Sequence, residues 1–188
     1  MSDKPQGTEA DRLPRIIDRR TIHRGRKFDF DLLTVTQGGK QSTREVVRHP
    51  GAVVIVPMLD DGRLVLIRNF RVSLGERLWE CCAGTIEPPE DPVVCASREL
   101  IEETGYRAAT LTPLGWFYTT PGLTDERMHA YFATGLTHIG QDLEDDEAIL
   151  VEAVPVAQAF EMIDSGELRD AKSMLAILLA ERAGRLHR

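Results

Sequence analysis

Residues 84–106 read GTIEPPEDPVVCASRELIEETGY, and this stretch predicts a helix with clear limits at both ends. Asp91 is a preferred N-cap residue, Pro92 suits the first helical position, and Gly105 is a typical stop. The apolar positions between them recur at spacings of three and four, which gives one apolar face: Val93, Ala96 and Leu100. We therefore expect a helix over residues 92–104.

The same helix gathers three carboxylates in its last two turns. Glu99 and Glu103 are four residues apart and Glu102 lies between them, so their side chains project close together. Like charges at that spacing cost a few tenths of a kcal/mol per pair, and the C-terminal end of the dipole disfavours anions. Two interpretations follow. The carboxylates hold a hard divalent cation, or they form a solvated acidic face that Arg98 relieves by pairing with Glu102.

The flanking residues favour the first interpretation. From Gly84 the chain gives five residues, Glu90, seven residues, and then Arg98 followed by ELIEETGY. This pattern resembles the signature of the Nudix hydrolases at every fixed position, and Tyr106 is a soft departure where an aliphatic residue is usual. The resemblance implies hydrolysis of a nucleoside diphosphate linked to a further moiety, with Mg²⁺ or Mn²⁺ as cofactor.

The resemblance also implies roles for the residues of the motif. Glu99 and Glu103 are expected to be the principal metal ligands, helped by Glu102 and the backbone carbonyl of Ala83, with Glu102 and Glu103 counted as catalytic. The remaining motif residues are expected to support the loop and helix rather than to perform chemistry: Gly84, Glu90, Arg98 and Gly105.

Related enzymes draw a further Glu from a mobile loop as a metal ligand or general base. The loop here is expected at residues 141–147, where Glu147 is the best match and Glu144 and Asp145 are the alternatives. Closing such a loop on substrate completes a site only when it is occupied. The competing interpretation is a solvated acidic loop.

Outside the motif, the chain resembles the ADP-ribose pyrophosphatase branch of the family. Asn69-Phe70-Arg71, Leu78-Trp79-Glu80 and a proline at 121, 15 residues beyond Tyr106, follow that branch, whereas Cys81-Cys82 departs from it. The expected reaction converts ADP-ribose, or a related nucleoside diphosphate sugar, to a nucleoside monophosphate and a sugar phosphate. The alternatives are a GDP-mannose-type or broad nucleotide-sugar pyrophosphatase, and a Nudix-fold sensor that binds ADP-ribose without cleaving it.

Four residues outside the motif are expected to bind substrate. Arg71 is a forked donor for phosphate or ribose, Phe28 is a stacking partner for the base with Arg44 beside it, and Pro121 marks the branch. Phe28 lies in an alternating segment, so a buried core position is the alternative. In related enzymes the N-terminal strands exchange across a homodimer, and we expect a homodimer here.

Composition narrows the function further. The chain has 188 residues and a net charge of −7, with +4 over residues 1–50 and −11 over the remainder. A net negative charge after residue 50 argues against broad nucleic-acid binding. It is consistent with a local cluster of carboxylates, and equally with an acidic surface that only confers solubility. No apolar run is long enough to span a membrane, the N-terminus is no secretory signal, and three cysteines without metal spacing predict reduced thiols. We expect a cytoplasmic protein without a membrane partner.

The pattern along the chain predicts an α+β fold. The resemblance implies more specifically a Nudix-type α/β/α sandwich with a mixed sheet, together with a small N-terminal antiparallel β subdomain. The predicted division is a disordered leader over 1–14, the β subdomain over 15–50 and the Nudix domain over 51–188. Strands are expected at 28–32, 42–47, 52–59, 64–67, 78–83, 111–118, 128–133 and 148–154. Two more helices are expected, one after Pro155 and one after Asp170.

Overall fold

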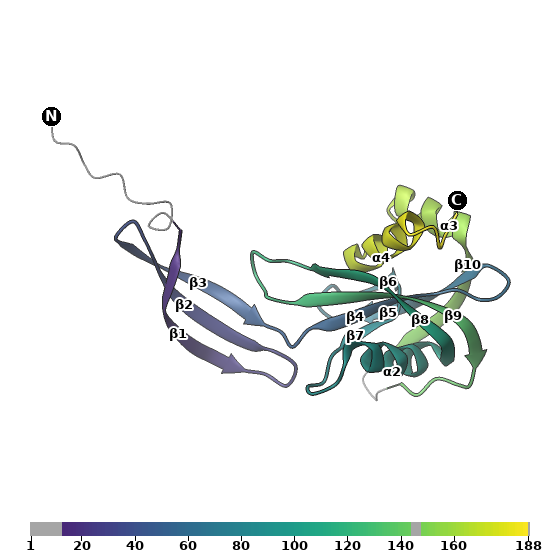
Figure 1. The fold of residues 1–188 in the computed structure, drawn as a ribbon, viewed down its shortest axis with the longest axis horizontal. Coiled ribbons are helices and arrows are strands. Elements are labelled where there is room, and N and C mark those ends of the chain that lie inside the picture. The colour runs from purple at the N-terminus through teal and green to yellow at the C-terminus, as the bar shows by residue number, and fades with distance from the viewer. Residues whose placement is uncertain (1–12, 144–147, 188) are drawn as a thin grey trace. The chain divides into compact units, whose positions relative to one another are not determined.

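The structure, a computed structural model, describes residues 13–143 and 148–187 (Figure 1). Two compact units make up the chain: Met1–His49 with Thr120–Glu126, and Pro50–Thr119 with Arg127–Arg188. The predicted leader falls almost entirely outside the described residues, and the predicted domain boundaries stay predictions. Within the described ranges, no helix is both long enough and apolar enough to cross a membrane.

The first unit contains one antiparallel sheet in the order β1-β2-β3. Its strands are β1 (Arg15–Arg24), β2 (Asp29–Gln37) and β3 (Lys40–Arg48). The turn between β2 and β3 contains Gly38 and Gly39, and both adopt positive φ (56° and 76°), which a side chain would disfavour. β1 was not predicted as a strand, since its charged residues interrupt any alternation of apolar and polar positions.

Strand β2 has the expected period of two, but the buried face is the other one. Asp31, Leu33 and Val35 are buried, whereas Phe28, just before the strand, is exposed. The buried Asp31 is acceptable because its carboxylate accepts hydrogen bonds from Thr21 Oγ1 at 2.8 Å and from Arg48 Nε at 3.2 Å. A carboxylate with charged and polar partners can therefore share a face with Leu33 and Val35.

These partners make the stability of the first unit sensitive to acid. The hydrogen bond from Thr21, followed by that from Arg48, lowers the pKa of Asp31 below its ordinary value of 3.8. Because the folded pKa is the lower one, the stabilisation is full above pH 3.8 and is lost as the pH falls through the folded pKa. Asp31→Asn is expected to flatten this acid limb in denaturation curves measured from pH 6 to pH 2. An unchanged limb in that variant would assign the effect to other carboxylates.

The second unit contains a mixed four-stranded sheet and a three-stranded antiparallel sheet. The first has the order β7-β4-β9-β8, with β4 parallel to β9, and the second has the order β10-β5-β6. Their bounds are β4 Ala52–Pro57, β5 Arg63–Arg71, β6 Glu76–Glu80, β7 Ala83–Thr85, β8 Tyr106–Tyr118, β9 Arg127–His138 and β10 Ile149–Pro155.

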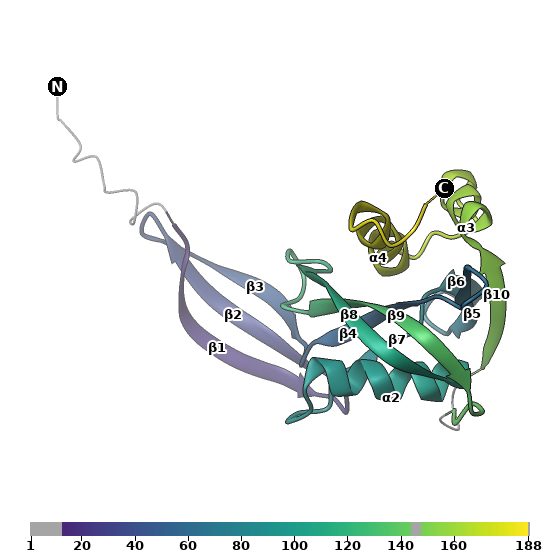
Figure 2. The ribbon, with the colours of Figure 1, turned by 45° about the vertical axis from the view of Figure 1, so that its right-hand side comes forward.

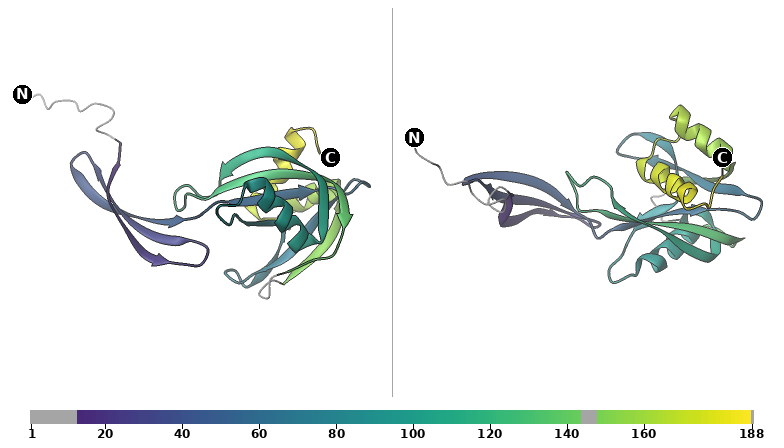
Figure 3. Two further views of the ribbon diagram at one scale, coloured as in Figure 1. Left: turned by 60° about the horizontal axis from the view of Figure 1, so that its bottom comes forward. Right: turned by 45° about the horizontal axis from the view of Figure 1, so that its top comes forward.

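Strand β4 is buried on both faces and separates two apolar layers. Val53 and Ile55 face a cluster formed with helix α2 (Pro92–Thr104), whereas Val54 and Val56 face a cluster formed with the two C-terminal helices. Those helices are α3 (Val156–Ser165) and α4 (Ala171–Arg182). Figures 2 and 3 show α2 on one side of the mixed sheet and α3 and α4 on the other. The predicted α/β/α sandwich is confirmed.

Three features of the second unit differ from what the sequence pattern indicates. The expected strand over 78–83 is two strands, because Cys81-Cys82 carries the chain from β6 in one sheet to β7 in the other. A proline in the run 52–59 favours an edge strand or a bulge, but β4 is a central strand and Pro57 is its last residue. The helical spacing of the apolar residues in α4 favours Leu175 and Leu178 on the buried face, but both are exposed, and the buried residues are Ser173, Ala176, Ile177 and Ala180.

The three cysteines, Cys81, Cys82 and Cys95, are buried and form no disulfide with one another. Cys81 and Cys82 pack in the two different apolar clusters on either side of the mixed sheet. Burial raises the pKa of the Cys81 thiol to about 12, so the thiol stays protonated at neutral pH. The cytoplasmic location inferred from reduced cysteines stays a prediction.

Candidate active site

Helix α2 has the predicted limits at both ends. The Asp91 carboxylate accepts a hydrogen bond from Val93 N–H at 2.9 Å, and Pro92 occupies the first turn. Gly105 adopts φ 75° and donates its N–H to Ile101 O at 2.8 Å. Local capping chemistry therefore fixes which turns of the helix carry the carboxylates.

The buried face of α2 combines apolar side chains with two carboxylates. Cys95, Ala96 and Leu100 are fully buried, while Glu99 and Glu103 are only 8% and 3% exposed. Val93, expected on the apolar face, is exposed, because Cys95 takes the inward position of the first turns. Two buried acids on the face that meets the sheet require polar partners there.

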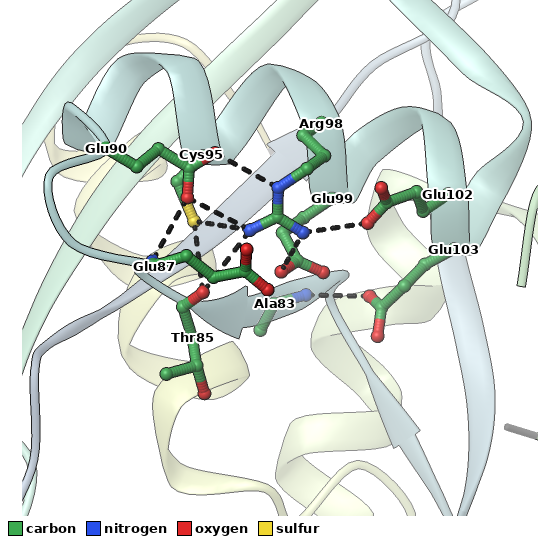
Figure 4. Close-up of polar contacts among 9 residues, drawn as sticks. All are labelled: Ala83, Thr85, Glu87, Glu90, Cys95, Arg98, Glu99, Glu102 and Glu103. Carbon is green, nitrogen blue, oxygen red and sulfur yellow. Dashed lines mark hydrogen bonds and ion pairs between the residues drawn. The ribbon is translucent and has the colours of Figure 1, made fainter. Parts of the chain in front are cut away.

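Strand β7 supplies part of that partnership because it is the edge of its sheet. Ala83 N–H donates to Glu103 Oε2 at 2.8 Å. Thr85 O accepts from Arg98 Nη2 at 3.3 Å and from Cys95 Sγ at 3.6 Å. Figure 4 shows these side chains of α2 reaching the strand in the place that another strand would otherwise occupy. The start of the 84–106 motif is thus bonded to both ends of the helix.

Arg98 links the loop to the carboxylates. Its Nε and Nη2 donate to the two oxygens of Glu90 at 3.0 and 3.1 Å, and Nη1 donates to Glu99 and Glu102 at 2.8 Å each (Figure 4). The hydrogen bonds between the two side chains raise the pKa of Arg98 above its ordinary value and lower the pKa of Glu90 below its ordinary value. The pairing of Arg98 with Glu102 that the second interpretation predicted is present, and Arg98 also ties the acidic face to the loop. Metal binding by the carboxylates stays a prediction.

Gly84 leaves the space in which the Glu99 carboxylate lies. A Cβ added at Gly84 would stand 1.8 Å from Glu99 Cδ and 1.9 Å from Oε1, so any side chain there would displace the Glu99 carboxylate. The backbone conformation of Gly84 is not the left-handed one, so the requirement is for space alone. The glycine opens a cradle for a carboxylate at the beginning of the motif.

The donor set in this cradle suits a hard divalent cation. Glu99, Glu102 and Glu103 offer carboxylate oxygens from adjacent turns of one rigid helix, which is the chemistry that Mg²⁺ and Mn²⁺ select. Among the described residues, no three His, Cys, Asp or Glu side chains already form a metal-ligand group. The Arg98 guanidinium holds one oxygen of Glu99 and one of Glu102.

Removing the arginine is expected to destabilise the second unit. Arg98→Met leaves Glu90, Glu99 and Glu102 without their shared cation, and the free energy of unfolding is expected to fall by about 2 to 3 kcal/mol. Millimolar Mg²⁺ or Mn²⁺ is expected to restore part of the loss, because a dication replaces the missing charge. Urea denaturation with and without metal measures both effects. Arg107→Met, an exposed arginine just beyond α2, is the control and should change stability by less than about 0.5 kcal/mol.

Three of the predicted substrate residues belong to the first unit. Phe28 is exposed and stacks on His49 with ring centroids 6.2 Å apart. Arg44 is opposite Leu33, whereas Asp29, next to Phe28, is opposite Arg48, so Arg44 is not beside Phe28 as expected. Pro121 is exposed in the segment Thr120–Glu126. The binding roles of all three stay predictions.

Arg71 belongs to the second unit and forms a two-pronged pair with Glu80. Its Nε donates to Glu80 Oε1 at 2.6 Å, and its Nη2 donates to Glu80 Oε2. Glu80 was predicted only as part of the branch pattern, with no role of its own. A glutamate inside the apolar run from Leu78 to Cys82 was the available signal, because a buried charge requires a partner.

The predicted loop residues cannot be placed in the same way. Glu144, Asp145 and Glu147 lie outside the described residues, so their roles as base or ligand stay predictions. On the described side of the loop, Gln141 Nε2 donates to Glu103 O at 2.7 Å, and Asp142 N–H donates to Glu102 O. The loop therefore starts against the last turn of the helix that bears the carboxylates.

Comparison with known proteins gives consistent matches. The profile of the NUDIX domain matches residues 47–177. The ADP-ribose pyrophosphatase of Bacillus subtilis (strain 168) is 38% identical over 164 residues, which cover 86% of this chain and 89% of that protein. The GDP-mannose pyrophosphatase of Escherichia coli O1:K1 / APEC is 33% identical over 166 residues, 79% and 86% of the two chains. The crystal structure of an ADP compounds hydrolase matches with a TM-score of 0.79 and 25% identity, over 92% of this chain and 97% of that one.

Proposed function

This chain belongs to the Nudix hydrolase family, and we propose that it hydrolyses the pyrophosphate bond of nucleoside diphosphate sugars, with ADP-ribose as the preferred substrate. A water oxygen bonds to one phosphorus, the bond from that phosphorus to the bridging oxygen breaks, and the bridging oxygen leaves with the other phosphate. ADP-ribose and water then give AMP and ribose 5-phosphate. The observation that carries the proposal is the presence of three carboxylates in the last two turns of α2, one of which, Glu99, lies in the space left by Gly84.

Each group of residues has a distinct task in this reaction. Glu99, Glu102 and Glu103 would hold the metal, with the Ala83 carbonyl as a further ligand. The Arg98–Glu90 pair keeps the loop and the helix in register, as its hydrogen bonds require. Arg71 would bind the anionic substrate through its guanidinium. When bound, a divalent cation supplies neutralisation of the pyrophosphate charge and polarisation of its oxygens.

Divalent-metal dependence is general among Nudix hydrolases, and we assign Mg²⁺ or Mn²⁺ to this one because all the proposed ligands are hard oxygens.

Glu147 is proposed as the general base or an additional ligand, with Glu144 as the alternative. Substitution of each by Gln separates them, since loss of the base should lower kcat strongly while leaving KM nearly unchanged.

A substrate panel tests the proposed reaction. Purified protein with Mg²⁺ is assayed for phosphate-monoester products from ADP-ribose, GDP-mannose and dinucleoside polyphosphates. A kcat/KM highest for ADP-ribose supports the proposal. Inactivity on both sugars beside high activity on a dinucleoside polyphosphate would overturn it. A preference for GDP-mannose favours the second candidate, which rests on the 33% identical relative. Binding without any turnover would favour a sensor, but a sensor has no need of all three glutamates.

We propose that the protein is a homodimer that pairs through the first unit. All ten residues of β1 are exposed in the single chain, and they include Ile16, Ile17 and Ile22. An exposed strand with three isoleucines is a ready interface for a second copy of the same strand. Light scattering is expected to give twice the chain mass, and Ile17→Asp should reduce it to the mass of one chain. A monomeric wild-type protein at micromolar concentration would contradict the proposal.

A further inference from the structure

A second polar network connects the start of α4 with the β5–β6 pair. Glu80 is fully buried, and its carboxylate accepts hydrogen bonds from Arg71 and, at 2.6 Å, from Lys172 Nζ. Lys172 also donates to Asp170 at 2.9 Å, and Asp170 is the N-cap of α4. Two cations, Arg71 and Lys172, thus surround the buried Glu80 carboxylate, and Lys172 links it to Asp170, so that three segments of the chain meet there.

Lys172, the second cation, stabilises the charge of the Glu80 carboxylate, which is a role beyond the packing of α4. A carboxylate with no exposure loses its hydration, so it needs donors for both oxygens. Arg71 bonds both Glu80 oxygens, but 38% of its side chain remains exposed, whereas Lys172 is mostly covered at 15%. Lys172 therefore supplies the better shielded charge and fixes the Glu80 carboxylate from the side of α4.

A further bond joins the same helix turn to the motif. Ser173 Oγ accepts a hydrogen bond from Cys81 N–H at 2.8 Å, one residue after Glu80. Two residues further on, Ala83 N–H is bonded to Glu103. The crossover between the two sheets is thus held from α4 at its beginning and from α2 at its end. The orientation of Glu80 is consequently tied to the strand that enters the carboxylate site.

Arg71 keeps donors available after binding Glu80. Its Nε and Nη2 are used, and within the part of the chain that the structure describes no hydrogen bond or ion pair involves Nη1. The hydrogen bonds with Glu80 raise the pKa of Arg71, and more distant contributions come from Asp170 and Glu103. The guanidinium is therefore held on one side and is within electrostatic range of the carboxylate cluster on α2.

We propose that Lys172 is a positioning residue, which fixes Glu80 and thereby presents Nη1 of Arg71 to the anionic part of the substrate. The inference rests on the proposed function, in which Arg71 binds substrate. Lys172 does not touch substrate in this arrangement. Its effect passes through the Glu80 carboxylate, so it concerns substrate affinity more than the chemical step.

The test compares two substitutions at the same helix start. Lys172→Met keeps most of the side-chain volume and removes the charge, and KM for ADP-ribose is expected to rise on the order of tenfold with a smaller change in kcat. Lys172→Arg should recover most of the affinity. Arg169→Met is the matched control, because it removes an exposed ion pair of 2.6 Å between the same turn and Glu76 of the same hairpin, without touching Glu80. Its KM is expected to equal that of the wild type.

A direct measurement on Arg71 separates this inference from the proposed function. The Nε–H resonance of Arg71, assigned with Arg71→Lys, is expected to exchange slowly with solvent in the wild type and in Arg169→Met, and fast in Lys172→Met. Slow exchange together with an unchanged KM in Lys172→Met would overturn the positioning role. If no nucleoside diphosphate sugar is cleaved by the wild type, the proposed function fails while the exchange rates still decide the role of Lys172. Lys172→Gln, which keeps a donor, serves if the Met variant does not fold.

Discussion

Glu103→Gln is expected to lower kcat on the order of 10³-fold, about 4 kcal/mol of transition-state stabilisation, while the protein keeps its fold. The fold survives because Glu103 uses one oxygen as an acceptor for Ala83 N–H at 2.8 Å, and the glutamine carbonyl accepts the same bond. The substitution also removes one charge from a crowded acidic face. What it removes is an anionic ligand from the expected metal site.

The measurement pairs initial rates at saturating Mg²⁺ with Mn²⁺ titration of the free protein. Weakened Mn²⁺ binding together with the loss of kcat assigns Glu103 to the metal. Glu161→Gln is the control, because Glu161 is exposed on α3 and outside the carboxylate cluster, and its kinetics should match the wild type. Turnover that persists in Glu103→Gln with excess Mg²⁺ would refute the assignment of this residue.

The parts of the structure that sequence predicted are those set by local chemistry. Asp91, Pro92 and Gly105 define the limits of α2 through hydrogen bonds and backbone preferences that act within a few residues. The grouping of Glu99, Glu102 and Glu103 follows from helical periodicity alone. Consequently the position of the carboxylates relative to one another was predictable before any tertiary contact was known.

The parts that sequence missed depend on contacts between distant segments. Nothing local distinguishes one strand over 78–83 from two strands in different sheets, because the apolar run continues through Cys81-Cys82 without a turn residue. The inward face of α4 includes Ser173, which accepts a hydrogen bond from Cys81 N–H at the crossover, a contact that the helix sequence alone does not reveal. The buried face of β2 was likewise decided by the partners of Asp31, which come from β1 and β3.

Gly84→Ala is expected to be the second most damaging substitution, although it adds one methyl group. The new Cβ would lie 1.8 Å from Glu99 Cδ, and ordinary contact begins at 3.4 Å, so the carboxylate must retreat by roughly 1.6 Å. Overpacking of this kind costs about 1 to 3 kcal/mol of stability. A ligand misplaced by more than 1 Å is expected to lower kcat/KM on the order of 100-fold.

A double substitution separates the two effects, because the clash needs both side chains. Gly84→Ala combined with Glu99→Ala is expected to be about as stable as Glu99→Ala alone, whereas activity stays low in both. Gly122→Ala controls for the loss of a glycine, because a Cβ at residue 122 meets no atom within 4 Å and the φ of Gly122 is not positive. The thermal unfolding of this variant should match that of the wild type. Wild-type activity and stability in Gly84→Ala would mean that the Glu99 carboxylate does not occupy the cradle in solution. A cation site in the last two turns of α2 would then have no geometric basis, because the space that admits the Glu99 carboxylate is what distinguishes this acidic turn from a solvated one.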